Sequence, residues 1–129
     1  MNKIIVEISV GELFDKISIL EIKKEKIKES QKLKFIDIEY KLLNDQLDKN
    51  VKIDEKIKKL FEELKDINSK LWVIEDEKRI CEKNSDFNEK FIKLSRDVHF
   101  LNDDRAKIKL NINNYTGSKI KEIKEYTNY

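Results

Sequence analysis

The sequence predicts an all-α protein, an antiparallel helical bundle or coiled coil of about four helices arranged as two hairpins. Apolar residues recur at alternating spacings of three and four along most of the chain, which is the period of an amphipathic helix. The chain contains no proline and only two glycines, Gly11 and Gly117, both near its ends. Because proline and glycine are the strongest helix breakers, only short polar segments are expected to separate the helices.

The N-terminal part of the chain predicts a short strand followed by the first helix. Residues 3–8 read KIIVEI, a run of β-branched and apolar residues that is typical of a strand. Ser9 and Glu12 have the spacing of a capping box, in which each side chain satisfies the other residue's backbone amide. We therefore expect a helix over residues 10–29, with Lys24 as a charged position in its apolar face.

Three further helices are expected over residues 31–49, 54–83 and 87–114. The first of these is apolar on two sides, which is typical of a helix at the centre of a bundle. Asp54 is suited to cap the start of the next helix, and Gly117 can supply the left-handed conformation that ends the last one. The tail, residues 118–129, is expected to form either a last helical turn or an extended segment that could lie alongside the N-terminal strand.

Length and composition point to one helical domain over residues 1–129. Charged residues make up 42% of the chain, yet the formal net charge is only +2, so nucleic-acid binding is not expected. No apolar run approaches the roughly 20 residues that a membrane span needs, and no signal peptide is evident. We therefore expect a cytoplasmic protein.

Metal and cofactor sites are not expected. A single cysteine excludes an internal disulfide, and one cysteine with one histidine argues against a zinc site. The sequence contains no glycine-rich phosphate loop, nucleophile elbow or metal-ligand cluster. These patterns predict neither a cofactor nor a bound metal.

Arg105 occupies a position in the apolar face of the last predicted helix. If the last two helices pair about Asn84–Asp86, Arg105 lies level with Asn68, and continuing the registers to the first helix adds Glu21 and Lys24. A buried guanidinium needs a carboxylate partner, which Glu21 would provide. The four residues then form either a structural polar layer or a site for a small anionic molecule, unless Arg105 simply extends its charge to solvent.

Residues outside this group are further candidates. Trp72 lies beside the apolar face of its helix, and Glu75 and Arg79 have the spacing of an ion pair on a helix. Tryptophan and arginine are enriched at protein interfaces, although ordinary edge packing also explains them. Asp15, next to Lys16 in the first helix, suits the positive end of the helix dipole, and a functional role is the alternative.

The chain also resembles a bacterial family that is known as domain of unknown function 6165. The opening segments Val6–Leu13 and Asp15–Lys23 carry the resemblance first. It continues through short groups along nearly the whole chain: Leu71-Trp72, Ile74-Glu75-Asp76, Arg79, Asp86-Phe87, Phe91-Ile92, Asn102-Asp103, Arg105-Ala106, Ile108-Lys109, Ile112-Asn113 and Gly117-Ser118. The C-terminal end, Glu122–Tyr126 and three further residues, departs from the family's usual finish. The resemblance implies a small, mostly helical, single-domain protein and implies no activity.

A non-enzymatic helical interaction or oligomerisation module is the function that these patterns favour. The longer second hairpin should project beyond the first and leave apolar surface uncovered, at positions expected to include Ile74, Cys81, Phe91 and Leu94. Such a surface normally meets a partner protein or a second copy, so we expect a homodimer or a complex with another protein, with Trp72, Glu75, Arg79 and Leu94 as interface candidates. The alternative is a small helical enzyme or a binder of an anionic molecule that uses Glu21, Lys24, Asn68 and Arg105.

Overall fold

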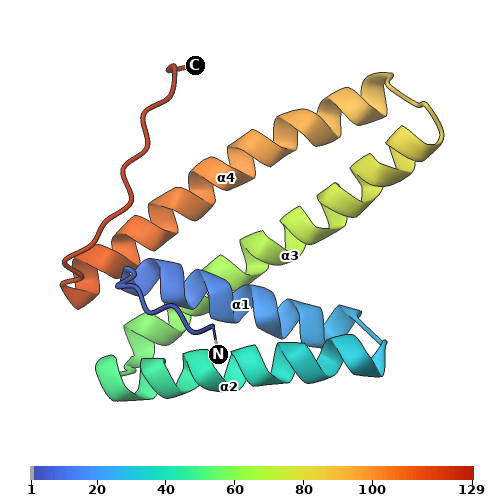
Figure 1. Ribbon diagram of the computed structural model, residues 1–129. Coiled ribbons are helices and arrows are strands. Elements are labelled where there is room, and N and C mark those ends of the chain that lie inside the picture. Colours follow the sequence, from blue (N-terminus) through green and yellow to red (C-terminus); the bar gives the residue numbers. More distant parts are fainter. Residues whose placement is uncertain (1) are drawn as a thin grey trace.

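The computed structural model describes residues 2–129, which form four helices joined by short connections, with an extended segment at each end (Figure 1). The helices are α1 (Val10–Lys26), α2 (Ser30–Asn50), α3 (Glu55–Lys83) and α4 (Glu89–Thr116). Together they cover 74% of the chain, and no strand occurs within the described residues. The predicted all-α fold with four helices in two hairpins is therefore confirmed.

The two hairpins cross rather than lie side by side (Figure 1). Helix α1 packs against α2, α3 and α4, whereas α2 packs chiefly against α1. The α3–α4 hairpin continues well beyond the crossing, and we call this projecting part the arm (Figure 1). The core lies at the crossing and consists of apolar side chains from all four helices: Leu13, Phe14, Ile17, Leu47, Ile57, Leu60, Leu64 and Ile112.

The expected central position of α2 is wrong, because α1 occupies it. Helix α1 buries apolar residues around most of its circumference, so it can contact three neighbours at once. The second apolar side of α2 instead faces outward, and Phe35 is 66% exposed there, with Ile38 and Leu42 nearby on the same face.

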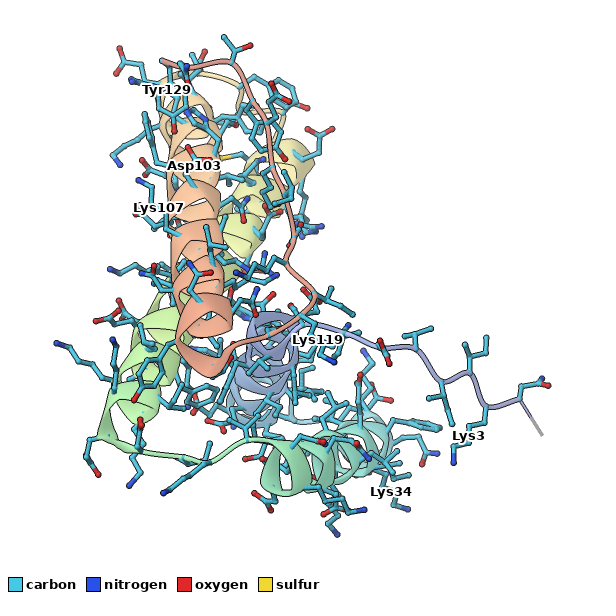
Figure 2. All side chains as sticks on the ribbon, turned by 90° about the vertical axis from the view of Figure 1, so that its left-hand side faces the viewer. Lys3, Lys34, Asp103, Lys107, Lys119 and Tyr129 are labelled. Carbon is cyan, nitrogen blue, oxygen red and sulfur yellow. The ribbon has the colours of Figure 1, made fainter. Side chains whose placement is uncertain are left out.

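The expected strand over residues 3–8 is also wrong. A strand needs a neighbouring strand for its backbone hydrogen bonds, and the described chain contains none. The segment therefore leaves Ile4 and Ile5 more than 80% exposed. It runs away from the tail, and Figure 2 shows Lys3 on the side of Lys34 and far from Tyr129.

The helix boundaries follow local capping chemistry. Ser9 accepts a hydrogen bond from the Glu12 amide at 3.0 Å, and Asp54 accepts one from the Ile57 amide at 2.9 Å. Gly117 ends α4 in the left-handed conformation with φ 69°. These three caps lie where the sequence predicted them, although α1 ends at Lys26 rather than near residue 29.

The C-terminal tail is not helical and runs along α4 from the crossing toward the arm (Figures 1 and 2). Its last residue, Tyr129, donates a hydrogen bond to Asp103 and packs edge-on against the rings of His99 and Phe100. No helix among residues 2–129 has both the length and the apolar composition to cross a membrane.

Candidate functional site

The buried carboxylate of Asp15 joins α1 to α4. Asp15 Oδ1 accepts a hydrogen bond from Arg105 Nε at 3.0 Å, and Asp15 Oδ2 accepts a second, shorter one from Arg105 Nη2. This bidentate arrangement is the strongest geometry for an arginine–carboxylate pair. The Asp15 side chain is fully enclosed, whereas the Arg105 side chain remains 29% exposed. One edge of the guanidinium therefore stays near solvent.

Helix α3 enters the same network through Asn68. The Asn68 side-chain amide donates to Asp15 Oδ1 and to Ser18 Oγ, both at 2.8 Å. Ser18 in turn donates to the backbone carbonyl of Asp15 at 2.8 Å. Within the described residues, no buried side-chain nitrogen or oxygen lacks a hydrogen-bond partner. The network is therefore satisfied, as a buried polar cluster must be to stabilise a fold.

Lys109 adds a second cation one turn after Arg105. Its Nζ atom lies 2.7 Å from Glu12 Oε2, 3.3 Å from Asp15 Oδ2 and 3.4 Å from Glu122 Oε2 of the tail. Only 11% of the Lys109 side chain is exposed. We call Asp15, Ser18, Asn68, Arg105 and Lys109 the polar layer.

The pKa values in the polar layer follow from these contacts. Burial alone would raise the pKa of Asp15, but hydrogen bonds from Arg105 and Asn68 outweigh it and hold the pKa below its usual value. Burial would lower the pKa of Lys109, yet Glu12 and Asp15 raise it overall. The pKa of Arg105 is raised in the same way by Asp15 despite burial. All three groups are therefore charged at neutral pH.

A close approach of α1 to α4 places the polar layer. The Gly11 amide donates to Asn113 Oδ1 at 2.6 Å, and the Val10 amide donates to Ser118 Oγ at 3.2 Å. A Cβ atom on Gly11 would lie only 2.6 Å from the Lys109 backbone carbonyl oxygen. Glycine is thus required here because no other residue lets the two helices approach this closely.

A small polar cavity opens above the polar layer. Its volume is about 220 Å³, and it is lined by Glu12, Asn102, Arg105, Ala106, Lys109, Glu122 and Lys124. Helices α1 and α4 form its base, and the tail closes one side. Among residues 2–129, no three histidine, cysteine, aspartate or glutamate side chains are grouped so that they could hold a metal ion.

Two of the four predicted ligand-site residues belong to this region and two do not. Arg105 and Asn68 are joined through Asp15. The expectation that Glu21 pairs with Arg105 is wrong, because α1 crosses α3 at an angle and presents Asp15 at this level. Glu21 instead accepts from Tyr40 and Lys65, and Lys24 lies over the Tyr40 ring and pairs with Asp37.

The other members of the site were hard to identify from the sequence. The position of Asp15 near the start of its helix suits the helix dipole as well as a functional role, and Lys109 stands out only as part of the Ile108-Lys109 group of the family resemblance. The strongest available signal was positional, because Gly11, Asp15, Lys109, Asn113 and Ser118 all fall within segments that carry the family resemblance.

The arm carries the predicted interface residues, but not all of them are accessible. Leu94 is 7% exposed and Cys81 is 2% exposed, so both lie inside the hairpin and the expectation that they form uncovered surface is wrong. The two helices of the arm cover these side chains without further help. Trp72 is half-buried, while Glu75 and Arg79 form an exposed ion pair at 2.9 Å on the same flank of α3.

An apolar groove runs along another flank of the arm. It has a volume of about 590 Å³ and is lined by residues of α3 and α4 only: Ser69, Lys70, Val73, Ile74, Asp97, Phe100 and Leu101. Val73 is 47% exposed and Phe100 is 39% exposed, so both present apolar surface to the groove. Neither α1 nor α2 contributes to this groove, so the rest of the bundle leaves it open.

The comparisons with known proteins give one match. A model of a family described as "Family of unknown function (DUF6165)" matches residues 4–129. No curated protein and no solved structure matches the sequence. The match agrees with the resemblance seen in the sequence and adds no activity to it.

Proposed function

We propose a function for this chain from its own geometry, because the chain belongs to a family of unknown function (DUF6165). The protein is a non-enzymatic helical interaction module, and its arm pairs with the arm of a second copy. The two arms form a four-helix coiled coil in which each apolar groove covers the other. The open groove between Val73 and Phe100 is the observation that carries this proposal.

The apolar residues along the line where α3 meets α4, which we call the seam of the hairpin, differ in burial from one end to the other. Near the crossing, Leu64 and Ile112 are almost completely buried because α1 lies over them. Farther along the arm, Ile74 and Leu101 are only half-buried, although they occupy equivalent seam positions. Two helices alone enclose the side chains that point directly between them, such as Cys81 and Leu94, but they leave their flanks open, whereas a bundle of four can cover a flank as well. A second hairpin on the groove would give the arm the cover that α1 gives near the crossing.

The charges at the groove suit an identical partner. Lys70 stands on the α3 wall and Asp97 stands on the α4 wall. A twofold axis along the arms would set each α3 against the partner's α4, so that the wall carrying Lys70 faces the wall carrying Asp97 in both directions, while each of these charges stays paired within its own helix, to Asp66 and Lys93. The net charge of +2 gives little repulsion between copies.

The groove can be tested with one variant and a matched control. Val73→Lys places a charge in the apolar groove, and we expect sedimentation velocity at micromolar concentration to show a monomer. Phe35→Lys places the same charge on the exposed face of α2, and we expect it to sediment as the wild-type dimer does. A dimer for Val73→Lys would contradict the proposed interface.

A third variant distinguishes the two flanks of the arm. Trp72 follows Asn68 by one helical turn, so it lies on the flank toward α1 and not in the groove. We expect Trp72→Lys to leave the dimer intact. If Trp72→Lys dissociates the dimer and Val73→Lys does not, the interface is the flank of Trp72, Glu75 and Arg79.

A further inference from the structure

The polar cavity contains cationic groups held rigidly by the fold. The bidentate pair with Asp15 fixes the guanidinium plane of Arg105, and the carboxylates of Glu12 and Asp15 fix Lys109. Because these donor side chains are already held in place, they lose little conformational entropy when a ligand binds. The remaining Arg105 atom, Nη1, has only a long contact of 3.4 Å to Asn102 Oδ1. One edge of the guanidinium is therefore available for a better acceptor.

A carboxylate of the protein itself already uses this cavity. Glu122, in the extended tail, places Oε2 3.4 Å from Lys109 Nζ, and its other oxygen lies 3.3 Å from Lys124. Burial would raise the pKa of Glu122, but Lys109 and Lys124 lower it overall, so the group is present as a carboxylate. The distance to Lys109 is long for a charge-assisted hydrogen bond, which indicates a weak contact.

The tail contact has few supports around it. The Glu122 side chain is half exposed, and the neighbouring tail residues through Tyr126 are exposed as well. The tail is otherwise attached near Ser118 at one end and near Tyr129 at the other. A dissolved carboxylate could therefore replace Glu122 without disturbing the helices.

We propose that this cavity is a binding site for a small carboxylate, which takes the position of Glu122 and contacts Lys109 and the free edge of Arg105. When the Glu122 side chain is displaced, the cations Arg105, Lys109 and Lys124 face the two carboxylates of Glu12 and Asp15, and the one surplus positive charge matches one carboxylate. The volume of about 220 Å³ is below the roughly 300–1,000 Å³ of pockets for drug-sized ligands. The ligand is accordingly a small metabolite.

The test compares three forms of the full-length protein: wild type, Glu122→Gln and Glu125→Gln. Both variants remove one negative charge from the tail, but only Glu122 lines the cavity. Sodium acetate and L-glutamate are titrated at constant ionic strength against sodium chloride. Binding is followed by NMR through the Nε–H signal of Arg105, which its hydrogen bond to Asp15 protects.

We expect saturable shifts of the Arg105 signal with either carboxylate and none with chloride. In the wild type, the tethered Glu122 carboxylate competes with the added carboxylate at an effective concentration in the millimolar range. Glu122→Gln removes this competitor, so we expect it to bind the added carboxylate about fivefold more tightly than the wild type does. Glu125→Gln should bind as the wild type does. Equal affinities in all three proteins, or no saturable shift, would overturn the proposal.

A blocked tripeptide, acetyl-Lys-Glu-Ile-amide, presents the same carboxylate on a peptide chain. If this peptide binds Glu122→Gln while acetate and L-glutamate do not, the site recognises an acidic peptide segment and the proposal of a small metabolite fails. This result is independent of the dimer, because none of the groove residues lines the cavity.

Discussion

Replacing Asp15 by asparagine keeps the size of the side chain and removes the buried negative charge of the polar layer. In the native protein this carboxylate accepts two hydrogen bonds from Arg105 and one from Asn68, and it lies 3.3 Å from Lys109. Asparagine offers a single acceptor oxygen, and its amide group would face a cation. The helices α1, α3 and α4 would therefore lose the group that links them.

The expected cost is a large part of the stability of a domain this size. Removing one partner of a buried ion pair costs about 3–5 kcal/mol. Because the Arg105 side chain is still 29% exposed and can recover part of its hydration, we expect about 2–4 kcal/mol. The total free energy of unfolding of such a domain is roughly 5–15 kcal/mol, so Asp15→Asn should remain folded but fragile.

Urea denaturation followed by circular dichroism at neutral pH measures this loss. With a slope of about 2 kcal/mol per molar urea, the midpoint should fall by about 1–2 M while the slope stays unchanged. Glu75→Gln is the control, since it breaks only the exposed Glu75–Arg79 pair and should cost less than about 0.5 kcal/mol. A loss below about 1 kcal/mol for Asp15→Asn would refute the structural role of the polar layer.

Three further outcomes are expected from the same structure. The pKa of Asp15 is lower in the folded protein than in the unfolded chain, so its contribution to stability is complete above about pH 4 and is lost as the pH falls through the folded pKa. In urea titrations at successively lower pH, the free energy of unfolding of the wild type should therefore approach that of Asp15→Asn. Gly11→Ala should lower the free energy of unfolding by about 1–3 kcal/mol in urea melts, because the new Cβ atom meets the backbone carbonyl of Lys109. Gly117→Ala should lower it by about 1–2 kcal/mol, because alanine is strained at the positive φ of this position. A Gly11→Ala protein as stable as the wild type would contradict the close packing of α1 on α4. The enclosed thiol of Cys81 should react with a thiol reagent much more slowly in the native protein than in urea, and equal rates would show that the arm is open.

The local features of the fold could be predicted from the sequence, because short-range chemistry decides them. Ser9, Asp54 and Gly117 cap helices through contacts within one turn, and each cap lies where it was expected. Apolar periodicity likewise located the four helices to within a few residues. These features require no knowledge of how one helix sits on another.

The arrangement of the helices could not be predicted in the same way. The expected partner of Arg105 was Glu21, six residues from the true partner Asp15, and six residues of helix correspond to about 9 Å. That expectation assumed that all four helices lie antiparallel, so that residue levels can be carried from α4 through the intermediate helices to α1. The assumption fails because the two hairpins cross at an angle. The crossing depends on Gly11, where the missing Cβ lets α1 approach α4, and a single glycine near a helix start does not identify such a contact.

The burial of the arm also depends on the arrangement. The periodicity of α3 and α4 correctly predicted a longer second hairpin, but it could not say which flank α1 would cover. Cys81 of α3 and Leu94 of α4 are enclosed because each points toward the opposite helix of the hairpin. Val73 and Phe100, which were not among the residues predicted to be important, line the open groove.

The molar mass of the wild-type protein in solution, measured by light scattering over a micromolar dilution series, tests the central claim most directly. Paired arms require a mass of twice 15.5 kDa that falls toward 15.5 kDa on dilution. A mass of 15.5 kDa at every concentration would contradict the account and leave the groove of the arm without its proposed occupant.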